Sequence, residues 1–151
     1  MISDQIFQIA GAIAKSTPDF LKPLGPGKNG GDGRTQKFLE NLNVATEKEF
    51  SKRCEQQVPV ITSADFTFDY YIPEEKTVIE VALTLHNALS EFEKDIFKCI
   101  LSNEAGRIIK KLVFIGKKGA NKRLSRPGSK AICNFAQNRF GIEIVVKEIG
   151  E

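Results

Sequence analysis

The stretch that decides the fold is Asp65-Phe-Thr-Phe-Asp-Tyr-Tyr-Ile72, followed by Pro73-Glu-Glu-Lys76 and then Thr77-Val-Ile-Glu-Val-Ala-Leu-Thr-Leu85. Its first part alternates polar and apolar residues, its middle is a turn sequence, and its last part is rich in β-branched residues. Together these features predict a β-hairpin.

The hydrophobic pattern also predicts the register of this hairpin. If residues 73–76 form the loop, one apolar face is made of paired residues: Ile72 opposite Thr77, Tyr70 opposite Ile79, Phe68 opposite Val81 and Phe66 opposite Leu83. A slip of one residue would mismatch every pair. On the other face, Asp69 is expected directly across from Glu80.

Two carboxylates that face each other across strands repel, so Asp69 and Glu80 need a compensating charge. A divalent cation is one such charge, because Mg²⁺ binds carboxylate oxygens, waters and phosphate oxygens. It also activates a bound water and stabilises charge on a phosphate under attack. The alternative is a solvent-facing hairpin whose acids are satisfied by lysine or water, and spacing alone does not decide between the two.

Further helical and extended patterns flank the hairpin. Helices are predicted over Ser3–Ala14 with Ser3 as cap, over Thr35–Gln57, from a capping box at Ser90–Glu93 to about Asn103, and over Gly128–Phe140, where Gly141 ends the helix. Strands are predicted at Lys111–Gly116 and Ile142–Ile149, with a short extended run at Val58–Ile61. We therefore expect an α/β fold in the order α-β-β-α-β-α-β, with a central mixed sheet flanked by helices.

Length and composition fit one globular domain, with 151 residues, 41% hydrophobic and 27% charged. We divide it into an N-terminal helix with a glycine-rich loop (residues 1–34) and an α/β unit (residues 35–151). The loop, Pro23–Arg34, matches neither a P-loop nor a dinucleotide fingerprint and is expected to be a linker or a mobile loop.

The sequence also favours a cytoplasmic protein. No apolar run approaches the roughly 18 residues of a membrane span, and residues 1–15 lack the basic start of a signal peptide. Cys54, Cys99 and Cys133 are far apart in helical patterns and the chain has a single histidine. We therefore expect buried thiols in a reducing compartment and no structural zinc site.

Charge is distributed unevenly along the chain. Residues 105–142 contain no acid and ten Lys and Arg residues, and subtracting these ten from the net charge of +3 leaves −7 for the rest. A basic third of this kind predicts a nucleic-acid surface, although a solvated basic face is the alternative. The candidate DNA-binding residues are Lys117, Lys118, Lys122, Arg123, Arg126 and Lys130.

Asp69, ten intervening residues and then Glu80-Val81-Ala82, within this order of elements, resemble the PD-(D/E)xK nuclease superfamily. Within it the chain looks closest to orthodox type II restriction endonucleases of the BglII type, over roughly Thr35–Ile149. The resemblance implies a Mg²⁺- or Mn²⁺-dependent endonuclease that acts on double-stranded DNA. It also implies that Asp69 and Glu80 are catalytic metal ligands, and a homodimer if the cleaved site is symmetric.

Ala82 departs from this family, in which a polar residue at its place is proposed to orient the attacking water or stabilise the transition state. Three explanations stay open: a cation from the next helix (Lys94 or Lys98), a sufficient metal and substrate phosphate, or lost catalysis with retained DNA binding. Some members also use an acid on the first helix. For it Glu40 is the candidate metal ligand and Glu47 or Glu49 the alternatives, while a solvated helix face is the other role for any of them.

His86 follows the second hairpin strand, where its side chain would reach the metal-bound water or a phosphate; a surface or capping role is the alternative. Two further functions remain beside the endonuclease. An inactive DNA-binding or assembly subunit on the same fold is favoured by Ala82, and a small RNA-processing or repair nuclease is favoured by the short chain.

Overall fold

The computed structural model describes residues 1–22, 33–62, 66–83 and 88–150. Most of the glycine-rich loop and His86 lie outside these ranges, so the expectations for them remain predictions. The elements in chain order are α1 (Ile2–Ser16), α2 (Arg34–Phe50), β1 (Glu55–Pro59), β2 (Thr67–Ile72), β3 (Thr77–Ala82), α3 (Ala88–Glu104), β4 (Lys111–Lys117), α4 (Ala120–Leu124), α5 (Pro127–Phe140) and β5 (Glu143–Ile149). Short 3₁₀ turns lie at Ser51–Arg53 and Pro73–Glu75.

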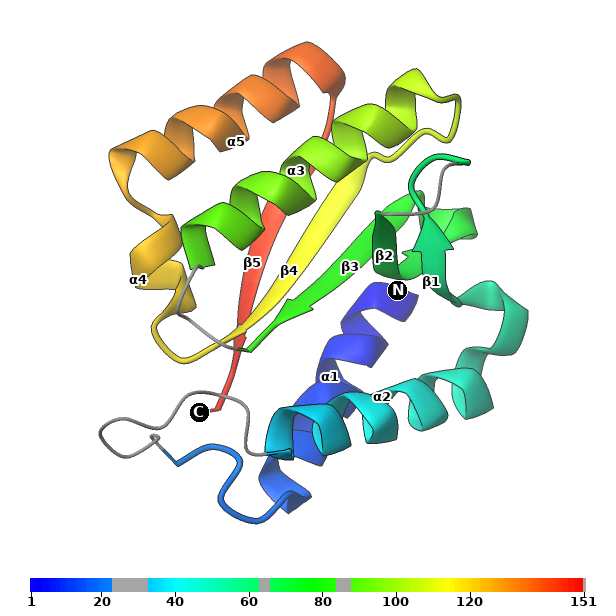
Figure 1. Cartoon of the computed structure of the whole chain (residues 1–151), viewed down its shortest axis with the longest axis vertical. Helices are drawn as coiled ribbons and strands as arrows, with labels where there is room; N and C mark the ends of the chain where they lie inside the picture. The colour runs from blue at the N-terminus through cyan, green and yellow to red at the C-terminus, as the bar shows by residue number, and fades with distance from the viewer. Residues whose placement is uncertain (23–32, 63–65, 84–87, 151) are drawn as a thin grey trace.

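The five strands form one mixed sheet in the order β1-β2-β3-β4-β5. Strand β2 is antiparallel to both β1 and β3, whereas β3, β4 and β5 are parallel. Helices α1 and α2 cover one face, and α3 and α5 cover the other (Figure 1). The expected α/β class with a central mixed sheet between helices is thus confirmed. No described helix is long and apolar enough to span a bilayer.

Two buried clusters form the core, one on each face of the sheet. Phe38 and Leu42 of α2 pack with Ile6 of α1 on the first face, and Phe92 and Ile96 of α3 pack on the second. The central strands are buried on both sides, since the five residues Leu112–Gly116 of β4 are all buried. This is the environment that parallel strands between two helical layers require.

Several predicted boundaries differ from the structure. Helix α2 ends at Phe50, because Ser51 takes a positive φ of 48° and a 3₁₀ turn leads into β1, a full strand where the sequence showed only an extended run. Cys54 therefore lies outside a helix, although it is buried as expected. Ser90 is not a cap, since α3 already begins at Ala88.

Ser3 does not cap α1 either, because that helix begins at Ile2 and its N-terminus is satisfied by Glu75. The Glu75 carboxylate accepts hydrogen bonds from the Ile2 backbone N–H and, at 2.7 Å, from Ser3 Oγ. A carboxylate is favourable at this positive end of a helix dipole. The contact fastens α1 to the turn between β2 and β3.

The register of the hairpin is as predicted near the turn, with Ile72 opposite Thr77 and Tyr70 opposite Ile79. The expectation of one continuous apolar face is wrong. Tyr70 and Ile72 pack on the side of α1 and α2, whereas Phe68 packs on the side of α3 and Phe66 is 41% exposed.

The strict alternation breaks at Asp69. The Val81 N–H donates a hydrogen bond of 2.8 Å to Asp69 Oδ2, so a side chain replaces the backbone acceptor of a regular ladder. On the other neighbour, β1, Gln57 has a positive φ of 50° and its side-chain Nε2 lies 3.4 Å from Asp69 Oδ1. The Asp69 carboxylate thus joins β2 to both of its neighbours.

Candidate functional site

Glu80 lies in the middle of β3 and faces α3, like its neighbours Val78 and Ala82, which pack in the core on that side. Its side chain is almost fully buried, with 4% exposed. Asp69 lies on the adjacent strand and is half-buried. The structure therefore brings the two predicted carboxylates to neighbouring strands beside the same helix.

The buried Glu80 carboxylate is met by an ammonium from α3. Lys98 Nζ lies 2.5 Å from Glu80 Oε1 and 3.1 Å from Asp95 Oδ1, and it donates a hydrogen bond of 2.8 Å to the carbonyl of Thr67. Asp95 and Lys98 are both buried, with 4% and 6% exposed. We call Asp69, Glu80, Asp95 and Lys98 the acidic cluster.

The sequence of α3 explains why these side chains face inward. Asp95, Lys98 and Ser102 recur at helical spacing, next to the apolar stripe of Phe92, Ile96 and Cys99, and all six are buried. Residues three and four apart share one face of a helix. The same periodicity turns Lys94 outward, where it forms an exposed ion pair with Glu91 at 3.0 Å. Lys98, and not Lys94, is therefore the cation that the structure brings to Glu80.

Burial dominates the electrostatics of the acidic cluster. Loss of hydration raises the pKa of Glu80 well above its usual range, the charges of Asp69 and Asp95 raise it further, and Lys98 opposes both. Burial likewise raises the pKa of Asp95 to about 6, against the effect of Lys98. The pKa of Lys98 is raised, because Glu80 and Asp95 outweigh the burial that would lower it.

The acidic cluster contains more carboxylates than ammonium groups. With all three carboxylates ionised and Lys98 protonated, the cluster would carry two net negative charges, which a divalent cation would neutralise. Glu80 Oε1 is buried and, although the ammonium is close, no hydrogen bond of suitable direction reaches it. Carboxylate oxygens are the donors that Mg²⁺ prefers, and it commonly uses only one or two of them together with waters and phosphate oxygens. The oxygen donors of Asp69 and Glu80 are therefore chemically compatible with a magnesium ion.

A larger protein-only cage is not formed. Within the described ranges, no group of three Asp, Glu, His or Cys side chains is placed to hold a metal ion. Glu40 is exposed on α2, on the opposite face of the sheet from α3, and its carboxylate accepts a hydrogen bond of 3.1 Å from Gln36. Glu47 and Glu49 are also exposed on α2. The structure does not bring any of these three acids into the acidic cluster.

The basic surface consists of Lys117, Lys118, Lys122, Arg123, Arg126 and Lys130, and it begins where β4 ends. Five of these side chains are exposed, while Lys117 is half-buried with its ammonium 4.4 Å from the centre of the Phe20 ring. The parallel register pairs Ala82 with Gly116. Residues 117 and 118 therefore follow the strand end that lies beside the end of β3, two residues beyond Glu80.

Two contacts hold α4 at this edge of the sheet. A Cβ on Gly116 would lie 2.6 Å from the Ala120 Cβ, so α4 packs directly against the glycine. The Glu148 carboxylate of β5 accepts hydrogen bonds from the backbone N–H groups of Gly119 at 3.2 Å and Asn121 at 2.6 Å. The helix that carries Lys122 and Arg123 is thus fixed to β4 and β5.

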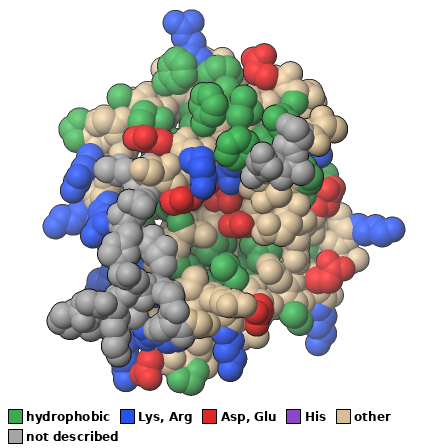
Figure 2. Space-filling view, viewed as in Figure 1, with side chains coloured by type: hydrophobic (Ala, Val, Ile, Leu, Met, Phe, Trp, Pro, Cys, Tyr) green, Lys and Arg blue, Asp and Glu red, His purple; other side chains and the backbone are tan. Residues whose placement is uncertain are grey.

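Figure 2 shows the distribution of charged and hydrophobic side chains on the face of the molecule seen in Figure 1. Acidic and basic side chains lie side by side in the centre of this view, and hydrophobic side chains gather above them over α3 and α5. Exposed hydrophobic residues on those helices include Phe97 and Phe135.

The sequence patterns do not single out Asp95, and they do not predict that Phe66 and Phe97 are exposed. The signal for Asp95 is its spacing of three from Lys98, together with the apolar stripe that turns both inward. Phe66 is expected on the apolar hairpin face, and no pattern singles out Phe97. Comparison of the chain with protein-family models, with curated proteins and with solved structures gave no match.

Proposed function

We propose that this chain is a Mg²⁺-dependent endonuclease of restriction type, which hydrolyses phosphodiester bonds of double-stranded DNA on a PD-(D/E)xK-like fold. The observation that supports it most is the ammonium of Lys98 against the Glu80 carboxylate. A cation from α3 at this place supplies what Ala82 lacks, so the departure from the family pattern has a compensating residue.

The acidic cluster divides the work among its residues in this proposal. Asp69 and Glu80 would hold Mg²⁺, or Mn²⁺ in its place, and the ion would supply Lewis-acid stabilisation of the phosphate and activation of the attacking water. Lys98 lowers the pKa of Glu80 against the effect of burial, and it would place one positive charge beside the scissile phosphate. Asp95 and the Thr67 carbonyl position the Lys98 ammonium.

The basic surface would bind the phosphate backbone next to this cluster. Its exposed lysines and arginines follow the strand end nearest to Glu80, and contacts from Lys and Arg to phosphates set register and affinity. We further propose a cytoplasmic location, which three free cysteines support, and a homodimer for a symmetric target.

A second candidate is an inactive DNA-binding subunit on the same fold. Glu80 is 4% exposed and already paired with Lys98, an arrangement that a purely structural ion pair also satisfies. In that case the basic surface would keep its role and the acidic cluster would serve stability alone.

The experiment is incubation of the purified chain with supercoiled plasmid and with RNA, in Mg²⁺, in Mn²⁺ or in EDTA. We expect metal-dependent DNA fragments that are lost in Asp69→Asn and Glu80→Gln and retained in Glu143→Gln, an exposed acid on β5. Salt-sensitive DNA binding without cleavage in either metal would support the inactive subunit. Cleavage of RNA alone would support the RNA-processing alternative.

A further inference from the structure

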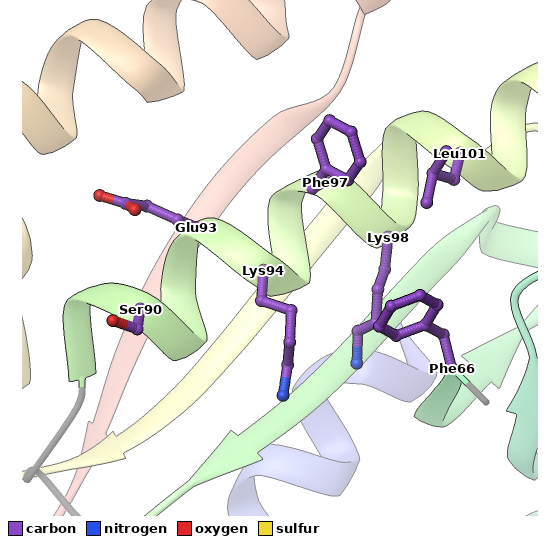
Figure 3. A pocket seen from close by; sticks show the side chains of 7 residues that line it. All are labelled: Phe66, Ser90, Glu93, Lys94, Phe97, Lys98 and Leu101. Carbon is purple, nitrogen blue, oxygen red and sulfur yellow. The ribbon is translucent and has the colours of Figure 1, made fainter.

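A pocket of about 350 Å³ opens on α3 beside the acidic cluster (Figure 3). Its lining residues are Phe66, Ser90, Glu93, Lys94, Phe97, Lys98 and Leu101. Lys98 belongs to both the pocket and the acidic cluster, so the pocket adjoins the cluster through this residue. The proposed function leaves this pocket without a role.

One stripe of α3 and one residue before β2 build the pocket. Ser90, Lys94, Phe97 and Leu101 recur at helical spacing and form a single outer stripe of the helix. Phe66 lies alongside this stripe, because the Lys98 ammonium is bonded to the carbonyl of the next residue, Thr67, at 2.8 Å. The pocket thus has an aromatic ring on each of two separate segments.

These rings are unusually accessible for phenylalanine. Phe97 is 59% exposed and Phe66 is 41% exposed, so both present apolar surface to water. Large exposed apolar side chains that gather at one place mark an interaction site rather than a packing necessity.

Two lysines line the pocket, and one of them is available to an anion. In Figure 3 Lys94 and Lys98 point in the same direction, while Glu93 points away from them. The Lys98 ammonium is engaged by Glu80 and Asp95, and its aliphatic stem lines the pocket. Lys94 is held only in an exposed pair with Glu91, which costs little to exchange for another anion.

We infer that this pocket binds one unpaired nucleotide, with its base against Phe97 and Phe66 and its phosphate against Lys94. Every base has a π-face that stacks on an aromatic ring, and a lysine beside such rings suits the backbone phosphate. Ligand pockets range from about 300 to 1,000 Å³, so this one has the size for a single small ligand. The inference rests on the proposed function for its substrate class and narrows it to DNA with an extruded or unpaired nucleotide near the cleaved bond.

A fluorescent base tests this directly in the full chain, with EDTA present to prevent cleavage. We would compare a duplex that carries one unpaired 2-aminopurine with the same duplex fully paired. The wild-type chain should bind the unpaired form more tightly, and the emission should fall as the base stacks. Phe97→Ala should lose about 5- to 100-fold of that preference, the range expected for one base stacked on an aromatic ring. Lys94→Ala should weaken binding of both duplexes, by a smaller factor than the loss caused by Phe97→Ala. Phe97→Tyr should keep the preference for the unpaired duplex.

Phe135→Ala is the matched control, since Phe135 is 53% exposed on α5 and does not line the pocket. Equal affinity for both duplexes, or equal behaviour of Phe97→Ala and Phe135→Ala, would overturn the inference. So would conversion of a dimer to a monomer by Phe97→Ala in analytical ultracentrifugation with unchanged base binding, because the patch would then be an interface between copies.

The outcome is separable from that of the proposed function. Plasmid cleavage that depends on Asp69, without preference for an unpaired base, would leave the endonuclease standing and remove the pocket's role. A Phe97-dependent preference for the unpaired base without cleavage in any metal would support the pocket's role and contradict the endonuclease.

Discussion

The Lys98 ammonium lies 2.5 Å from the Glu80 carboxylate, and both side chains are buried between β3 and α3. A buried pair of this kind gains little over an apolar contact, since each charge has lost its hydration, but removal of the Lys98 ammonium would leave the carboxylates of the cluster uncompensated. The arrangement is therefore costly to keep and more costly to break. The cost of burying these charges fits a functional role for Glu80 and Lys98.

Lys98→Met should destabilise the fold strongly, because three carboxylates would remain with no ammonium. Methionine keeps most of the apolar stem, so the loss reports the charge. We expect about 3–5 kcal/mol from the free energy of unfolding in urea, the usual range for breaking a buried pair. Lys94→Met is the matched variant, whose exposed pair with Glu91 should contribute within about 1 kcal/mol. Similar losses in the free energy of unfolding of the two variants would show that the buried Lys98 ammonium contributes no more to stability than the exposed one of Lys94.

Mg²⁺ should raise the melting temperature of the wild-type chain relative to EDTA, because a ligand that binds only the folded state stabilises it by mass action. Glu80→Gln should abolish this rise, while its own stability in EDTA stays near or above that of the wild type, since one of three crowded negative charges is removed. Asp69→Asn should also lose the rise, although its amide oxygen still accepts from the Val81 N–H. Thermal scans over a Mg²⁺ titration measure this, and a rise of equal size in Glu80→Gln would place the ion elsewhere.

The acidic cluster should make stability depend on pH in a defined direction. The pKa of Asp95 is raised from 3.8 to about 6 by burial, so between these values the folded chain binds a proton more tightly than the unfolded chain. Stability contributed by this protonated form is therefore lost as pH rises from about 4 to 6. Asp95→Asn removes the titration, so in EDTA its free energy of unfolding relative to the wild type should be higher at pH 7 than at pH 5. A difference that is constant across this window would contradict the assignment.

The basic surface should carry most of the affinity for duplex DNA. Reversal of Lys118, Lys122 and Arg126 to glutamate should weaken binding and flatten its dependence on salt, by about 0.9 in the logarithmic slope for each phosphate that is no longer neutralised. The control reverses three other lysines, Lys37, Lys48 and Lys52, which are exposed on α2 and just beyond its end. Fluorescence anisotropy at several salt concentrations gives both quantities. Equal weakening in the two sets would mean that net charge alone attracts DNA.

The hairpin shows what the sequence could and could not provide. The register near the turn follows from burial of one face, since a one-residue slip would expose Tyr70 and Ile72. The break at Asp69 was not predictable from hydrophobicity, because it depends on a carboxylate that accepts a backbone N–H in place of a carbonyl.

The choice between Lys94 and Lys98 shows a similar limit in the candidate site. Hydrophobic spacing in α3 contains the answer, because Phe92, Ile96 and Cys99 define an inner stripe next to Lys98. Only the packing of that helix against β3 shows that the inner lysine meets Glu80. The exclusion of Glu40, Glu47 and Glu49 from the site could not be predicted for a similar reason, since the sequence does not say which face of the sheet α2 covers.

Gly116 should prove essential for the position of the basic surface, although it carries no functional group. Gly116→Ala would place a Cβ 2.6 Å from the Ala120 Cβ, so either β4 or α4 must shift. Overpacking of this kind usually costs about 1–3 kcal/mol, and displacement of α4 should also weaken DNA binding through Lys122 and Arg123. Gly128→Ala is the matched control, because a Cβ there meets nothing within 4 Å and alanine favours the helix at the start of α5. Urea unfolding and anisotropy on both variants separate the effects. If Gly116→Ala lost stability but kept full affinity, the close packing of α4 would be needed for the fold and not for placing the cations.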